Sequence, residues 1–373
     1  MNFSNITDWT ITEGAVKQVT DSLGRVIWEK QTPPTPENDY FYVEDASGSA
    51  NTLTIEKNAG NSTPTITVYY STDQTNWSLL GNTSTTGLTL NIPADSKVYL
   101  KATTNYWTVA YSNNNNWIGC FADFNIGGNI MSLIAGDNFP NANLVDGTNN
   151  YAFSRLFEGN NYLVDTSKLV LPNTVSSHCY YEMFFMCHNL LTTPALPATT
   201  LADYCYYYMF WGCTGLTTAP ALPATTLADS CYYGMFSGCT SLTTAPATLP
   251  ATTLADSCYY GMFRGCTSLT TAPVLSATTL ANNCYQNMFT ASGLTTSPVL
   301  PATTLVSGCY RVMFNGCSNL TSVTTYANDI SATNCLSSWL VNVAATGTFH
   351  NLGGATYTSG QSGIPSGWTE VNS

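Results

Sequence analysis

The sequence predicts a mainly β protein with short helices: an N-terminal hairpin, a small antiparallel β-sandwich, then a solenoid of about eight coils with a C-terminal cap. Three observations support this fold class. Cysteine pairs recur at a period of about 26 residues in the second half of the chain. Apolar and polar residues alternate in the first third. The length of 373 residues exceeds what one compact core usually holds.

Composition excludes several classes of function. Asp and Glu number 22 against 10 Lys and Arg, which gives a net charge of −12, and charged residues make up only 9% of the chain. Because phosphate contacts depend on Lys and Arg, we expect no nucleic-acid partner. A hydrophobic fraction of 44% predicts a folded chain with a polar, nearly uncharged surface. Without a long apolar run or a basic, apolar start, we expect neither membrane insertion nor a signal peptide.

Residues 1–32 are expected to form a hairpin, because Asp21–Gly24 is a turn signal between two apolar segments. Two strands alone are marginally stable, so this hairpin needs another surface to pack against. Its candidate anchoring residues are Val16, Val19, Val26, Ile27 and Trp28. Residues 33–38 form a Pro-rich linker that would hold the hairpin away from the rest of the chain.

Four further segments follow the linker. Residues 39–112 alternate apolar and polar positions between turn residues, which predicts half-buried antiparallel strands and a β-sandwich. Residues 113–150 are expected to connect this sandwich to the solenoid and to cap its first coil. Residues 151–345 hold the repeats, and residues 346–373 form a C-terminal cap.

Each repeat contains two cysteine positions eight residues apart, with Met-Phe between them. The apolar residues in this segment recur at steps of three and four, which predicts one face of a short helix. Two residues before each first cysteine lies a residue whose side-chain oxygen could cap that helix. A Leu-Thr-Thr segment follows and predicts a short strand that ends at a proline. The first cysteine column is Cys179, Cys205, Cys231, Cys258, Cys284, Cys309 and Cys335; the second is Cys187, Cys213, Cys239, Cys266, Ser292 and Cys317; the capping column is Ser177, Asp203, Asp229, Asp256, Asn282, Ser307 and Thr333.

These columns allow chemical interpretations besides packing. Disulfides and zinc sites are alternatives for the cysteines, but no repeat carries CxxC, and small buried reduced thiols fit the interior spacing best. The Asp column could bind calcium or act as catalytic carboxylates, but its replacement by Asn282 and Ser307 fits capping better. Residues 171–330 offer few acids and bases, and neither a nucleophile elbow nor a phosphate loop is present. We therefore expect no enzyme activity, no metal and no cofactor.

A binding surface is predicted where residues vary between repeats while the frame stays fixed. The tyrosine directly after each first-column cysteine is constant, which favours packing. The positions two residues before Met and directly after Met-Phe change, and their Tyr, Trp and Arg content is typical of interfaces. The alternative is an exposed surface with no partner. The candidate binding residues are Tyr181, Phe185, Tyr207, Trp211, Tyr233, Tyr260, Arg264, Gln286 and Arg311.

The repeat CYYGMFSGCTSLTTAP followed by LPATTLA resembles the BspA-like leucine-rich repeats of gut-anaerobe surface proteins and of the tailed, crAss-like phages that infect those bacteria. The resemblance covers roughly residues 127–373 and implies a leucine-rich-repeat solenoid. The N-terminal segment looks like the virion-anchoring peptides of phage fibre and decoration proteins. Together these resemblances imply a structural protein on the virion surface, anchored to a capsid or tail protein, that binds a host surface protein or glycan and could form a homo-oligomer. The alternative is an adhesin on a bacterial cell surface.

Overall fold

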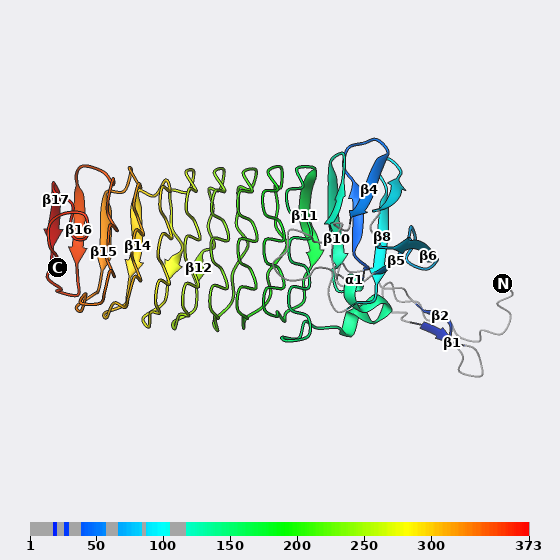
Figure 1. Cartoon of the computed structure of the whole chain (residues 1–373), viewed down its shortest axis with the longest axis horizontal. Coiled ribbons are helices and arrows are strands. Elements are labelled where there is room, and N and C mark those ends of the chain that lie inside the picture. The colour runs from blue at the N-terminus through cyan, green and yellow to red at the C-terminus, as the bar shows by residue number, and fades with distance from the viewer. Residues whose placement is uncertain are drawn as a thin grey trace.

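A computed structural model describes residues 18–20, 26–29, 39–56, 66–83, 87–104 and 117–372. The described part is mainly β, as the sequence predicts. Its helical elements are one short α-helix, α1 (Ser132–Ala135), and one 3-10 helix, η1 (Gly136–Asn141). No helix in the described ranges is long and apolar enough to span a membrane. Figure 1 shows two sheets at one end of an elongated molecule and successive coils side by side up to the C-terminus.

The hairpin expected near the N-terminus is present. Strands β1 (Gln18–Thr20) and β2 (Val26–Glu29) pair antiparallel, with Val19 opposite Trp28. Val16 and the linker 33–38 lie outside the described residues. The anchoring role of this hairpin stays a prediction.

Two sheets follow the hairpin, and their buried side chains belong to one hydrophobic core. A three-stranded sheet has the order β7-β4-β9, and a six-stranded sheet has the order β11-β10-β3-β8-β5-β6. The strands are β3 (Tyr42–Asp45), β4 (Asn51–Glu56), β5 (Thr67–Ser71), β6 (Ser78–Asn82), β7 (Leu88–Ile92), β8 (Lys97–Ala102), β9 (Trp117–Cys120), β10 (Phe124–Asn129) and β11 (Leu163–Val170).

The predicted sandwich boundary at residue 112 falls inside these sheets, and the sheets are not purely antiparallel. Strands β9 and β10 come from the predicted connector, and β11 comes from the first part of the repeats. Strand β10 pairs antiparallel with β3 on one side and parallel with β11 on the other. Gly127 permits close packing there, because a Cβ at this position would lie 2.3 Å from the Tyr42 hydroxyl oxygen. The six-stranded sheet therefore continues directly into the repeats.

Residues 151–345, called the repeat stack below, are joined by hydrogen bonds between successive repeats. The Tyr180 N–H donates to the Cys205 carbonyl, and the Tyr206 N–H donates to the Cys231 carbonyl, both at 3.0 Å. These pairs are 25 residues apart in the sequence, so each repeat lies beside the next. The same bonding continues along the repeats and keeps equivalent residues aligned in columns.

The segment between the two cysteines of a repeat is not the helix that the sequence predicts. Every second backbone N–H donates to a carbonyl of the next repeat. The alternate N–H groups donate to the carbonyl three residues earlier in the same repeat, as Cys205 does to Ala202. Every fourth residue has positive φ, as at Tyr204 (56°), Tyr208 (51°) and Gly212 (71°). The result is a run of tight turns, whose four-residue period also produces apolar steps of three and four.

The predicted helix-capping column has a different role. The Asp203 carboxylate accepts the N–H of Asp229 at 3.1 Å, and the Asp229 carboxylate accepts the N–H of Asp256 at 3.1 Å. Asp256 in turn accepts the N–H of Asn282 at 2.9 Å. These side chains are exposed and connect one repeat to the next, because no helix start is present to cap.

The short strands also lie elsewhere than predicted. The Leu-Thr-Thr segments contribute the isolated bridge between Thr218 and Thr244, whereas β12 and β13 begin after the prolines. Strand β14 runs through Pro298, where its register with β15 shifts between Thr296 and Val299, so the missing N–H is tolerated. The parallel strands are β12 (Thr248–Leu249), β13 (Val274–Leu275), β14 (Thr296–Leu300), β15 (Ser322–Thr325), β16 (Gly347–Asn351) and β17 (Trp368–Val371).

The core of the repeat stack consists of aligned columns of identical residue types. The rings of Phe184 and Phe210 stack at 5.4 Å and 6°, and Tyr180 stacks on Tyr206 at 5.6 Å and 8°. The tyrosines after the first cysteines are buried, which confirms their packing role. All thirteen cysteines are free and buried, as expected for packed thiols.

Candidate functional site: an aromatic face

Four of the predicted binding residues form a ladder of stacked rings. Tyr181 stacks on Tyr207 at a centroid distance of 4.8 Å, Tyr207 on Tyr233 at 4.7 Å, and Tyr233 on Tyr260 at 4.3 Å. All four side chains are partly exposed. We call these residues the tyrosine ladder. A second, shorter stack lies beside it, where Phe185 packs on Trp211 at 4.7 Å and 9°.

The backbone fixes the spacing of the ladder. The carbonyls of Tyr207, Tyr233 and Tyr260 accept N–H groups of the preceding repeat at 2.8, 2.9 and 2.7 Å. The ring separations near 4.7 Å therefore follow from the distance between the hydrogen-bonded backbones of successive repeats. The side chains need little further ordering to adopt this arrangement.

Face-to-face stacking decides which parts of the rings a ligand can reach. The rings of Tyr207 and Tyr233 are each stacked between two other rings, so their faces are covered. The ladder therefore presents ring edges and hydroxyl groups to a ligand. At one end the Arg155 guanidinium lies 5.7 Å from the centroid of Tyr181. At the other end the Asn287 amide donates to the Tyr260 hydroxyl at 2.8 Å. Burial raises the pKa values of the Tyr207 and Tyr233 hydroxyls, so both stay protonated and can donate as well as accept.

Gln286 was predicted to face solvent and does not. It is only 9% exposed, and its amide lies 3.5 Å from the Tyr260 hydroxyl. The side chain continues the column of the tyrosine ladder and packs at its end, which explains its burial. Arg264 and Arg311 are exposed, as predicted.

Tyr208 is a residue of this face that the sequence reasoning missed. Its ring meets Tyr207 at 4.5 Å and 64° and Tyr233 at 5.4 Å and 82°, so it lies roughly perpendicular to the ladder. The side chain extends over Gly234, where a Cβ would lie 2.0 Å from Tyr208 Cε1. The equivalent position one repeat further is Gly261, where a Cβ would meet nothing within 4 Å. A large residue followed by two glycines in one column is the sequence signal that could have found it.

We call Tyr181, Tyr207, Tyr208, Tyr233, Tyr260, Phe185 and Trp211 the aromatic face. Its N-terminal border carries an ion pair between Arg155 and Glu182 at 2.7 Å, with Glu158 at 3.7 Å. Burial raises the pKa of Glu182, and the Arg155 charge opposes this rise. The pair is part of the frame that holds the face, since Arg155 also packs near Tyr181.

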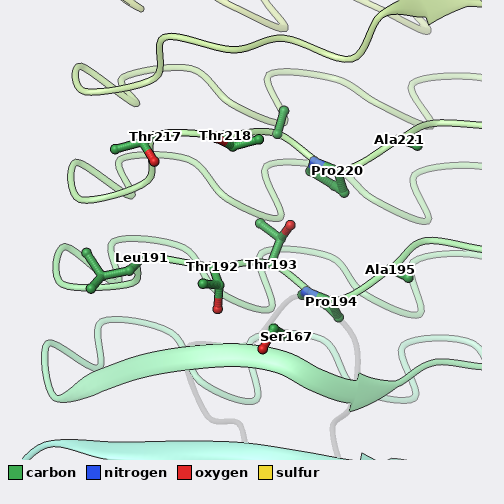
Figure 2. A pocket seen from close by; sticks show the side chains of 11 residues that line it. Ser167, Leu191, Thr192, Thr193, Pro194, Ala195, Thr217, Thr218, Pro220 and Ala221 are labelled. Atoms are coloured by element: carbon green, nitrogen blue, oxygen red, sulfur yellow. The ribbon is translucent and has the colours of Figure 1, made fainter.

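A separate hollow of about 540 Å³ lies between β11 and two neighbouring repeats, as Figure 2 shows. Threonine, proline and alanine side chains line it, among them Thr193, Pro194, Thr217 and Pro220. None of its lining side chains is titratable. The hollow can offer hydroxyl groups and apolar contacts, but no acid or base.

The described ranges contain no candidate metal-binding site, because no three His, Cys, Asp or Glu side chains converge there. The fold and the face together define a class: a mainly β repeat protein that presents an ordered row of aromatic edges. Comparison with protein-family models, curated proteins and solved structures finds no match.

Proposed function

We propose that this protein is a non-enzymatic bacteriophage virion structural protein, a fibre subunit or a decoration subunit of the capsid or tail. In this proposal residues 151–345 are a leucine-rich-repeat solenoid of about eight coils, of the BspA-like type, that binds the host surface. The observation that carries the binding role is the aromatic face. The resemblance of the repeats and of the N-terminal segment to phage proteins supports the virion setting.

The order of the aromatic face supports a binding role. Tyr and Trp supply large contact area with few rotatable bonds, and they dominate the energetics of many interfaces. Here ring stacking and the backbone ladder fix them before any partner arrives, so binding loses little side-chain entropy. The core tyrosines keep the same residue type in all six repeats from Tyr180 to Tyr310. The ladder column instead changes from Tyr to Gln286 and Arg311 after four repeats, and the column of Phe185 changes in every repeat.

A glycan is the host ligand that fits best. The exposed edges of Tyr207 and Tyr233 offer hydroxyls that both donate and accept, which matches the hydroxyls of sugars. Trp211 and Tyr208 add apolar ring surface beside them. A repeating row of such groups suits a repeating polymer better than it suits a single small molecule.

Attachment to the virion is assigned to residues 1–32, with a capsid or tail protein as partner. Val19 pairs with Trp28 in the register of β1 and β2. Two strands are too few to be stable alone, so a partner surface would stabilise this hairpin. Mass spectrometry of purified virions tests this setting. Stoichiometric recovery supports it, whereas recovery from a bacterial cell envelope alone would replace it with a cell-surface adhesin.

The adhesive role is tested by binding of the purified full chain to host cells. Trp211→Ala and Tyr208→Ala should each weaken binding by about tenfold, since central interface aromatics commonly contribute more than 1 kcal/mol. Tyr326→Ala is the matched control, because Tyr326 is an exposed tyrosine of the repeat stack outside the aromatic face, at 43% exposure. Equal effects of the three variants would contradict a specific role for the face.

A further inference from the structure

The repeat stack carries its charges in separate blocks. Residues 257–328 contain Arg264 and Arg311 and no Asp, Glu or Lys, although the whole chain has a net charge of −12. The exposed carboxylates of Asp203, Asp229 and Asp256 precede this segment, and the exposed carboxylate of Asp329 follows it. Three repeats of an acidic protein are thus purely cationic. We call residues 257–328 the cationic block.

Both arginines lie in columns that belong to the aromatic face. Arg264 is equivalent to Trp211 in its repeat, and its carbonyl accepts the Gly238 N–H at 2.7 Å. Arg311 is equivalent to Tyr260, and its carbonyl accepts the Asn287 N–H at 3.0 Å. Both side chains are exposed. Within the described ranges, neither guanidinium forms an ion pair with a carboxylate.

Neutral hydrogen-bonding groups fill the repeat between the two arginines. Asn287 and Thr290 are partly exposed there. Arg264 and Arg311 are two repeats apart, which corresponds to on the order of 10 Å along the stack. The surface thus presents two separated positive charges with amide and hydroxyl groups between them.

We infer that the cationic block binds an acidic polysaccharide, whose carboxylate or sulfate groups contact Arg264 and Arg311 while neutral sugars extend along the aromatic face. This inference rests on the adhesive function proposed above and specifies its ligand. Guanidinium groups favour such oxyanions through paired N–H donors. The Asn287 amide already donates to the Tyr260 hydroxyl, and the Thr290 hydroxyl donates to the Val312 carbonyl. Their oxygen atoms can still accept hydrogen bonds from sugar hydroxyls.

The charge distribution also disfavours other polyanions. Double-stranded DNA carries a charge about every 1.7 Å of its helix axis, so a duplex lying along the stack would meet the Asp229 and Asp256 carboxylates next to the block. A chain with charges further apart can place them at the two arginines and avoid that repulsion. An acidic polysaccharide can place two of its charges at the two arginines, and the hydroxyl groups of its sugars then lie against the neutral groups between them.

The experiment measures binding of the full chain to polygalacturonate, dextran sulfate, neutral dextran and polyglutamate, at low and physiological salt. Wild type should bind at least one acidic polysaccharide, and binding should weaken as salt screens the charges. Arg264→Gln and Arg311→Gln should each lower that affinity roughly threefold, and together about tenfold. Lys168→Gln removes one exposed positive charge elsewhere on the stack and should leave affinity unchanged. Tighter binding of polygalacturonate would identify the acidic group of the ligand as a carboxylate, and tighter binding of dextran sulfate would identify it as a sulfate.

Several outcomes would overturn the inference. Unchanged affinity in the double variant excludes the two arginines, and equal binding of polyglutamate excludes selectivity for a polysaccharide. If the wild-type chain adheres to host cells through the aromatic face but binds neither acidic polysaccharide, the proposed ligand is wrong. The adhesive function is then retained. If it binds neither host cells nor any of the polysaccharides, the adhesive function is overturned as well.

Discussion

The thiol of Cys213 donates a hydrogen bond to the backbone carbonyl oxygen of Phe184 in the preceding repeat, with the sulfur 3.1 Å from the oxygen. The same bond joins Cys239 to Phe210 and Cys266 to Phe236, each at 3.1 Å. Cysteine fits this column because it is small and apolar enough for the core and still carries a weak donor. The second cysteine column therefore connects successive repeats through side chain and backbone.

Replacing one of these thiols should destabilise the stack. Cys239→Ala removes the S–H donor and leaves a small void, which should lower the free energy of unfolding by about 1–2 kcal/mol. The chain contains its own comparison at Ser292, which occupies the cysteine position in one repeat and is buried. Ser292→Cys should match or exceed the stability of the wild type. Urea-unfolding midpoints measure both variants, and an unchanged midpoint for Cys239→Ala would show that the bond contributes nothing.

The buried thiols should resist alkylation in the native chain. Burial raises the pKa of Cys187 and of Cys239 to about 12, so almost no thiolate exists near neutral pH. Iodoacetamide at pH 8 should leave these cysteines unmodified for hours, and all thirteen cysteines should react once guanidinium chloride unfolds the chain. Peptide mass mapping locates the modified residues. Rapid native labelling at Cys187 or Cys239 would contradict their burial.

Alkaline pH should unfold the protein steeply. Near pH 7 both the folded and the unfolded chain keep their thiols protonated. Above the ordinary thiol pKa of 9.0 only the unfolded chain loses protons, because burial holds the folded pKa of Cys179 and Cys231 at about 12. Stability is thus lost as pH rises from 9 towards 12, by about 1.4 kcal/mol per thiol and pH unit. Thermal midpoints between pH 7 and 11 check this, and a flat profile above pH 9 would refute it.

The sequence identifies the repeat period, the aligned columns and the buried residue types, because each repeat must place the same apolar groups in the same core. The helix that it predicts between the two cysteines of each repeat is wrong for a physical reason. A run of turns with positive φ every fourth residue, as at Tyr204 and Tyr208, repeats apolar positions at the same steps as a helix. Only the hydrogen bonds to the next repeat distinguish the two, and periodicity does not encode them.

The candidate site is predictable to a similar extent. Variation within a fixed frame locates the columns of Tyr207 and Trp211, and the structure brings both onto one surface. The same reasoning misses Tyr208, because its position depends on the absence of a side chain at Gly234 in another repeat. It also places Gln286 in solvent, since burial at the end of a ring stack depends on the neighbour in the column.

The Arg155–Glu182 pair should matter for stability in a pH-dependent way. Their side chains are 19% and 9% exposed, so Arg155→Met leaves a nearly buried carboxylate without its cation and should cost about 2–3 kcal/mol at pH 7. Burial already raises the pKa of Glu182 in the folded chain. The variant should therefore regain stability as pH falls from 7 to 5, when folding takes up a proton.

A double variant separates this effect from lost packing. Arg155→Met with Glu182→Gln removes the charge and should recover most of the stability at pH 7, with little dependence on pH. Urea unfolding at pH 5 and pH 7 provides the comparison. A deficit in Arg155→Met that is equal at both pH values would assign the loss to packing near Tyr181.

Two glycines offer a matched test of the position of Tyr208. Gly234 and Gly261 share a φ of +58°, so replacing either with Ala should cost the same backbone strain, about 1–2 kcal/mol. A methyl group at Gly234 must also displace the Tyr208 ring, whereas at Gly261 it enters open space. We expect Gly234→Ala to weaken binding to host cells about as much as Tyr208→Ala, and Gly261→Ala to retain most of it.

The combination of the two substitutions completes this test, because changes that act through one side chain do not add. Gly234→Ala in the Tyr208→Ala background should cause no further loss of cell binding, since no ring remains to be displaced. Equal losses in Gly234→Ala and Gly261→Ala would instead assign the effect to backbone strain. Additive losses in the double variant would mean that Gly234 contributes to the aromatic face independently of Tyr208.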